Sequence, residues 1–188
     1  GKVFVDIAQA LTGRIQGGPG LTAVVSSTMF SAINGSAVAG VVTTGTFTIP
    51  LMKRSGYRAK VAGAIEAAAS SAGQIMPPVM GAAAFIMAEM TQLPYATIAA
   101  AALIPALLYV FALLVSVRLE AGKFNLPRLE KSDVPSLTVI LRKQGYMLLP
   151  LIALIGFLIY GFTPAKCAVL SMVATLLLSS LKKETRLT

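Results

Sequence analysis

The chain has 188 residues, of which 56% are hydrophobic and only 12% are charged, and its net charge is +9. A soluble domain carries about 25% charged residues, so this composition indicates an all-α integral membrane protein. One cysteine and no histidine exclude intramolecular disulfides, zinc sites of Cys and His, and His-based catalytic triads. We therefore expect no enzyme and no resident cofactor, and we assign the positive charge to membrane-flanking loops rather than to nucleic-acid binding.

Residues 1–20 form an amphipathic segment that ends in the motif GGPG. Apolar residues recur at helical spacing, and polar residues lie on the other side: Lys2, Asp6, Gln9 and Arg14. This pattern predicts an interfacial amphipathic helix, and the alternative is the tail of a preceding span. Because the first residue is Gly and not Met, we expect the chain to be a fragment of a longer protein.

Residues 21–52 carry no charge. One helix of that length would measure ~48 Å at 1.5 Å per residue, which is too long for a hydrocarbon core of ~30 Å. Two helices that meet at Asn34–Gly35 would each have about 14 residues, fewer than the ~20 needed to span. The length therefore predicts a re-entrant helical hairpin, with its second helix beginning near Ser36.

Residues 61–93 are also too long for one level span, and the motif GQIMPP at 73–78 interrupts them. Proline removes a backbone donor and clashes with the preceding turn, so we expect a broken transmembrane helix that resumes near Val79. Further along, the pattern predicts a transmembrane helix at 95–117 with a possible kink at Pro105, a cytoplasmic connection at 118–145 with a short surface helix at 132–141, and two transmembrane helices within 146–181.

Lysine and arginine gather in the loops at 53–60, 118–143 and 182–186, which hold 13 of the 16 positive charges. The opposite loops hold only Lys166. The positive-inside rule makes the basic side cytoplasmic. A re-entrant hairpin also places Lys2 and Arg14 on that side, as the rule prefers.

Hydroxyl groups surround the predicted hairpin tip and the proline break. Na⁺ binds oxygen ligands, and unwound backbone supplies free carbonyl groups, while helix N-termini attract carboxylates. We therefore expect coupled ion and anion binding at the membrane midplane. The alternative is that these small residues only pack helices, as the spacing of Ser27, Ser31 and Gly35 allows. Glu66 and Glu89 lie toward opposite ends of their span, which favours interfacial positions over a proton relay.

The chain resembles a known family in two consecutive motifs. These are VVSSTMFSAINGSAVAGVVTTGTFTIPLMKRSGY and AAASSAGQIMPPVMGAAAFIMAE. Their order is similar to the large membrane subunit of TRAP (tripartite ATP-independent periplasmic) transporters, and GQIMPPVMGAAAF resembles the TAXI branch most. The resemblance implies an elevator-type secondary transporter with inverted repeats in the bacterial inner membrane, driven by Na⁺ or alternatively by H⁺. It also implies a periplasmic binding protein that delivers an organic acid, and a small four-helix membrane subunit or fused domain.

The same resemblance implies an ion site at the hairpin turn and the break: Ser31, Asn34, Gly35, Ser36, Gly73, Gln74, Met76, Pro77 and Pro78. The substrate is expected at neighbouring hydroxyl groups: Ser36, Thr43, Thr44, Ser70 and Ser71. Family members often carry Ser where Asn34 stands and a polar residue where Gly40 stands, so at these two positions the resemblance supports ligation by the backbone more than by the side chain. No arginine lies in the hairpin or the break, so an arginine that holds the carboxylate would come from outside these residues. The alternatives are a stand-alone anion/cation symporter and a non-transporting membrane scaffold.

Overall fold

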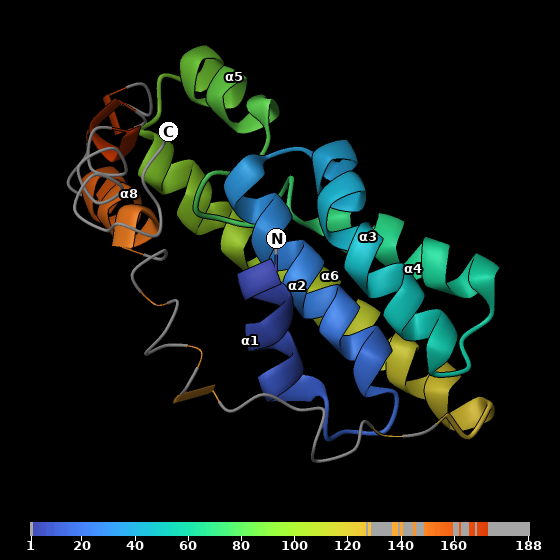
Figure 1. Ribbon diagram of the computed structural model, residues 1–188. Helices are drawn as coiled ribbons and strands as arrows, with labels where there is room; N and C mark the ends of the chain where they lie inside the picture. Colours follow the sequence, from blue (N-terminus) through green and yellow to red (C-terminus); the bar gives the residue numbers. More distant parts are fainter. Residues whose placement is uncertain are drawn as a thin grey trace.

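The computed structural model describes residues 2–126 without a gap and, beyond them, 128, 137–138, 140, 145, 149–159, 162, 166–167 and 169–172. All regular structure in this part is helical (Figure 1), as the composition predicted. The helices are α1 (Lys2–Thr12), α2 (Gly18–Asn34), α3 (Ala37–Arg54), α4 (Ala59–Ala72), α5 (Ala82–Thr91), α6 (Tyr95–Lys123) and α8 (Leu149–Ile159). Most of the predicted connection at 118–145, including much of the surface helix at 132–141, and most of 160–181 lie outside the described residues.

Helices α2 and α3 form a hairpin that turns at Gly35 and Ser36. Gly35 has φ +69°, and its N–H donates to the carbonyl of Ser31 at 2.7 Å, which is the usual left-handed end of a helix. Ser36 then caps α3 by accepting a hydrogen bond from the N–H of Ala39 at 3.3 Å. The two helices have 17 and 18 residues, more than the 14 expected. They are longer because Gly18–Gly20 joins α2 as its first turn and because α3 runs on to Arg54.

Helix α1 is shorter than the predicted segment 1–20. It ends at Thr12, and a non-helical turn containing Gly17, at φ +74°, leads into α2. The apolar face of α1 packs on the hairpin. The rings of Phe4 and Phe30 meet edge to face, with 6.0 Å between their centres, and the hydroxyl oxygens of Thr12 and Thr22 lie 2.9 Å apart.

The second broken segment runs from α4 through residues 73–81 to α5. It contains a cis peptide bond between Pro77 and Pro78, and the N–H of Gly81 donates to the carbonyl of Gln74 at 2.8 Å. The next helix begins at Ala82 rather than near Val79. It starts later because Met80 has a left-handed backbone, with φ +60°, and the carbonyl of Ala32 in α2 holds the N–H groups of Val79 and Met80 there.

Helix α6 continues without interruption through Pro105 to Lys123. In the described part it is the one helix long and apolar enough to cross a bilayer, with a mean hydropathy of 2.6. Helices α2, α3 and α4 pack on one another, and α6 packs on α2 and α4 (Figure 1). Their shared core is built mainly from small and aliphatic side chains: Leu21, Ala23, Val24, Met52, Tyr57, Ala62, Ile65, Ala69, Val117, Ala121 and Leu126.

Candidate ion and substrate site

The tip of the hairpin packs directly against the broken segment. A Cβ atom on Gly35 would overlap the carbonyl oxygen of Met80, and one on Gly73 would overlap Ser31. The carbonyl of Ala32 accepts from both Val79 and Met80 at 3.2 Å. The structure thus brings together two sequence motifs that are about forty residues apart, as a site shared between them requires.

Ser31 lies at the centre of this junction. Its side chain is fully buried, and its hydroxyl oxygen has no hydrogen-bond partner among the described residues. A buried polar atom without a partner in the protein is costly, and binding of an ion is one explanation for it. The hydroxyl groups of Ser31 and Ser70 both lie against Gly40, where an added Cβ would overlap the first and come within 2.9 Å of the second. Because Gly40 has no side chain, the hydroxyl groups of Ser31 and Ser70 can occupy the space beside it.

The remaining predicted ligands divide between buried and exposed positions. Thr44, Ser70 and Gly73 are buried, whereas Asn34, Ser71 and Gln74 are exposed. The other predicted residues are partly buried: Gly35, Ser36, Thr43, Met76, Pro77 and Pro78. The Ser71 hydroxyl donates to the carbonyl of Ala67 in its own helix at 2.8 Å.

Glu66, which its sequence position placed toward one end of its span, is enclosed by the protein. Its side chain is fully buried between α2, α3 and α4. Hydroxyl groups surround its carboxylate: Ser27 donates to Oε1 at 2.7 Å, Thr44 to Oε1 at 2.7 Å, Thr48 to Oε2 at 2.5 Å and Ser70 to Oε1 at 3.4 Å. The carboxylate is therefore enclosed by protein, and its depth in the membrane stays a prediction.

A signal for this burial was present in the sequence. The buried residues of α4 recur at helical spacing: Ala62, Ile65, Glu66, Ala69, Ser70 and Ala72. Glu66 thus shares a face with small residues that allow close packing. Reading the helical face, rather than distance from the ends of the span, would have placed the carboxylate inside. By contrast, Glu89 is exposed.

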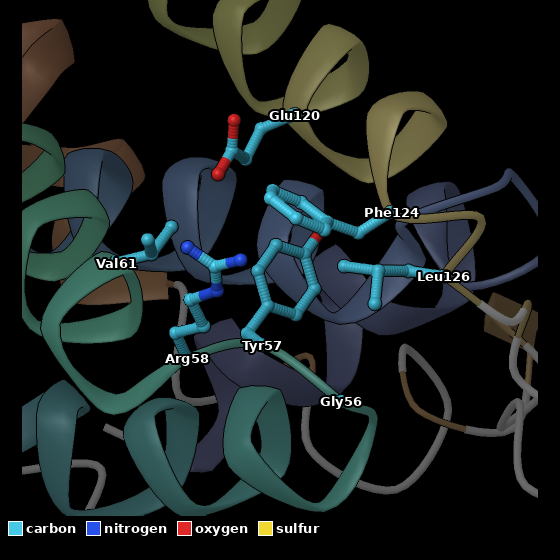
Figure 2. A pocket seen from close by; sticks show the side chains of 7 residues that line it. All are labelled: Gly56, Tyr57, Arg58, Val61, Glu120, Phe124 and Leu126. Carbon is cyan, nitrogen blue, oxygen red and sulfur yellow. The ribbon is translucent and has the colours of Figure 1, made fainter.

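A hollow of about 200 Å³ lies at the end of the hairpin away from its tip (Figure 2). The Arg58 guanidinium stands 4.4 Å from the centre of the Phe124 ring, and Glu120 extends toward the same hollow. Beside it, the Tyr57 hydroxyl donates to the carbonyl of Gly17 at 3.0 Å. Burial raises the pKa of Tyr57 to about 12, and nearby Glu120 adds to the increase. This contact ties the loop before α2 to the loop after α3.

Broken helices whose interruptions meet inside a helical membrane protein are the architecture in which secondary transporters bind ions and substrates. The family model described as "Tripartite ATP-independent periplasmic transporter, DctM component" matches residues 1–188. The chain therefore belongs to the DctM family, the large membrane component of TRAP transporters, and this part of the predicted resemblance is confirmed.

Several curated relatives carry permease names. The chain is 29% identical over 171 residues to the C4-dicarboxylate TRAP transporter large permease protein DctM of Pseudomonas aeruginosa, covering 90% of this chain and 40% of that protein. It is 28% identical over 180 residues to the sialic acid TRAP transporter large permease protein SiaM of Vibrio cholerae, covering 95% and 42%. It is 32% identical over 187 residues to the uncharacterized protein y4mL of Sinorhizobium fredii, covering 96% and 43%. The chain thus spans about two fifths of the length of these relatives.

Proposed function

We propose that this chain is part of a large permease that imports organic acids by Na⁺ symport. The observation that carries the proposal is the buried Ser31 hydroxyl, which lacks a partner where the hairpin turn meets the break. Hydroxyl oxygens and unwound backbone are the ligands that Na⁺ sites use in transporters. We propose that Na⁺ binds here, with Asn34–Ser36 and Gly73–Pro78 contributing mainly backbone groups.

The substrate is proposed to be a carboxylate. Two of the relatives are named for C4-dicarboxylates and for sialic acid, and both kinds of compound carry carboxyl groups. The N-terminus of α3, which begins one residue after Ser36, offers N–H groups and a partial positive charge to such a group. We propose that the substrate lies beside hydroxyl groups that the sequence already indicated, those of Thr43, Thr44, Ser70 and Ser71.

We also propose that both ends of the hairpin face the cytoplasm of a multi-pass inner-membrane protein. In support, Gly17 before α2 lies against Tyr57 after α3 and against Ala121 near the basic end of α6. The hairpin is therefore open toward the same side as several lysines and arginines, which favour the cytoplasm. We propose that a periplasmic binding protein and a small membrane subunit complete the tripartite system. We also propose that the permease belongs to the TAXI branch and transports by an elevator motion.

The test is uptake by the full-length permease in proteoliposomes with its small subunit and its binding protein. Labelled carboxylates are offered in Na⁺ or in K⁺, each with and without the binding protein. Replacing Na⁺ should lower uptake at least about fivefold, the minimum that a typical coupling free energy produces. Uptake that ignores Na⁺ but follows a pH gradient would move the coupling ion to H⁺. Uptake without the binding protein would indicate a stand-alone symporter, and no uptake by folded protein would indicate a scaffold.

A further inference from the structure

The feature that the proposed Na⁺ site leaves unused is the Glu66 carboxylate. It is 0% exposed, and its four polar contacts come from neutral hydroxyl groups on three helices. Gly45 lies close enough that an added Cβ would come within 3.2 Å of the Glu66 Cγ. The side chain is thus tightly enclosed between the hairpin and α4. Ionisable groups enclosed in this way within membrane proteins mark ion or proton paths.

No cation neutralises this carboxylate in the part of the chain that the structure describes. Helix α2 carries no charged residue. The charged side chains of α3, α4 and α6 stand toward the helix ends: Lys53, Arg54, Lys60, Arg118, Glu120 and Lys123. The titratable Tyr109 of α6 donates instead to the carbonyl of Ala68 at 3.2 Å. A permanent buried charge is normally paired with an opposite charge, whereas this one has only hydroxyl groups.

Those hydroxyl groups can serve two protonation states without moving their oxygen atoms. Thr44 Oγ1 lies 2.7 Å from Glu66 Oε1 and also 2.8 Å from the carbonyl of Gly40. Thr48 Oγ1 lies 2.5 Å from Oε2 and also 3.1 Å from the carbonyl of Thr44. Both can donate to the charged carboxylate. When the carboxyl group is protonated, Thr48 can turn its hydrogen to the backbone and accept the acid proton instead.

The spacing of these oxygen atoms fits a proton better than a metal ion. Octahedral ligands at about 2.4 Å from a cation stand about 3.4 Å apart. The contacts of Ser27, Thr44 and Thr48 with the carboxylate are shorter, at 2.5 to 2.7 Å, as in direct hydrogen bonds to a charged group. A metal ion would have to push this cluster open.

We propose that Glu66 is a proton-exchanging carboxylate, separate from the Na⁺ site proposed at the hairpin tip. One proton from water on one side of the membrane binds a carboxylate oxygen, neutralises it, and returns to water on the other side during the transport cycle. Ser70 lies 3.4 Å from Oε1 and shares the space beside Gly40 with Ser31, which supplies a line of hydroxyl groups toward the hairpin tip. The inference rests on the proposed transport function for its role, but the protonation itself is measurable without transport.

The direct test is infrared difference spectroscopy of the purified full-length permease. Spectra are compared as the pH is lowered stepwise from the alkaline to the acid side of neutrality. The wild type should gain the C=O band of a buried carboxylic acid, and Glu66→Gln should lack it. Glu89→Gln, which removes an exposed carboxylate, should keep it. Identical pH-dependent spectra for the wild type and Glu66→Gln would overturn the proposal.

A second pair of variants keeps the carboxylate, in case Glu66→Gln does not fold. Thr48→Val removes the donor to Oε2, and Thr46→Val removes an exposed hydroxyl group of the same helix that donates only to Thr43. Thr48→Val should change the pH range in which the band appears, whereas Thr46→Val should not. Equal behaviour of the two variants would contradict the hydroxyl network.

Transport gives the third readout and separates the two proposals. In proteoliposomes with equal Na⁺ on both sides, a proton gradient directed inward should stimulate wild-type uptake at least about fivefold. In Glu66→Gln the ratio of uptake with the gradient to uptake without it should fall to about one. Glu89→Gln should keep the wild-type ratio. A Glu66→Gln protein that still responds to the gradient refutes the proton role. A wild type that titrates in the infrared but transports no carboxylate refutes the proposed function alone.

Discussion

Gly35 packs directly against the carbonyl group of Met80, so the hairpin tip and the broken segment meet with no side chain between them. Both residues have left-handed backbone, with φ of +69° and +60°. Met80 lies there although it is not a glycine, since its N–H is held by the carbonyl of Ala32. The junction therefore depends on a glycine at the tip.

Gly35→Ala should destabilise the permease. The added Cβ would overlap Met80. The alanine would also have to adopt the left-handed backbone of Gly35, which costs about 1–2 kcal/mol for an L residue. The matched control is Gly63→Ala, where nothing lies within 4 Å of the added atom and where alanine favours the helix. Thermal unfolding of the full-length protein in detergent measures both. Equal midpoints for the two variants would argue against the close contact at the tip.

Ser31→Ala should separate ion binding from stability. The Ser31 hydroxyl has no partner among the described residues, so its removal loses no recorded hydrogen bond and should change the free energy of unfolding by less than about 1 kcal/mol. The Na⁺ concentration for half-maximal uptake should nevertheless rise at least about fivefold.

The control for that change is Ser26→Ala. Ser26 is also fully buried in α2, but its hydroxyl donates to the carbonyl of Thr22 at 2.7 Å. Its loss should cost about 1 kcal/mol of stability and leave the Na⁺ requirement as in the wild type. If both serine variants need the same Na⁺ concentration, Ser31 is not an ion ligand.

Local chemistry made the breaks predictable from the sequence. Gly35 followed by Ser36 combines a left-handed helix end with a helix cap, and Pro77–Pro78 prevents a continuous helix. Each of these signals acts within a few residues. Helix boundaries were less accurate where distant backbone decided them, as when Ala32 holds Val79 and Met80 and delays α5.

The environment of Glu66 could not be read in the same way. Its hydroxyl partners come from α2, α3 and α4, so the ring exists only after three helices have taken one relative rotation. Ser70 lies one turn away from Glu66 in the same helix, so spacing alone could have identified it as a neighbour, whereas nothing in the sequence points to Ser27 or Thr48. The same holds for Ser31, whose lack of a partner is a property of the packed junction.

Tyr57→Phe should change how stability depends on alkaline pH. Burial raises the pKa of Tyr57 from 10.0 to about 12, so the folded state holds the phenol proton more tightly than the unfolded state does. This stabilisation is complete below pH 10 and is lost as the pH rises toward about 12. The phenylalanine variant lacks both this contribution and the hydrogen bond to Gly17.

Near neutral pH the free energy of unfolding of the variant should therefore be lower than that of the wild type by about 1 kcal/mol. This difference should become smaller above pH 10. Unfolding midpoints of the two proteins across the alkaline range measure the difference. Tyr109→Phe, which removes a more exposed hydroxyl group, serves as the control. A difference that stays constant with pH would mean that the folded state does not hold the Tyr57 proton more tightly than the unfolded state does.

Tyr95→Phe should loosen the broken segment without removing an aromatic contact. The Tyr95 ring stacks on Phe85 at 5.0 Å, and its hydroxyl donates to the carbonyl of Val79 at 2.5 Å. Phenylalanine keeps the ring but leaves that carbonyl without its donor, at a cost of about 1 kcal/mol. The broken segment should then open more often, since the Tyr95 hydroxyl ties it to α6, while the hydrogen bonds to Ala32 tie it to the hairpin.

Opening of the segment can be followed with a thiol probe. In a Cys167→Ala background, Met80→Cys places a reactive group at a buried position of the break, and its labelling rate reports local opening. Tyr95→Phe should raise this rate about fivefold, as a loss of about 1 kcal/mol implies. Tyr109→Phe, whose hydroxyl donates to Ala68 within α4, should leave the rate unchanged. Equal rates in the two variants would show that the Tyr95 hydroxyl does not hold the break closed.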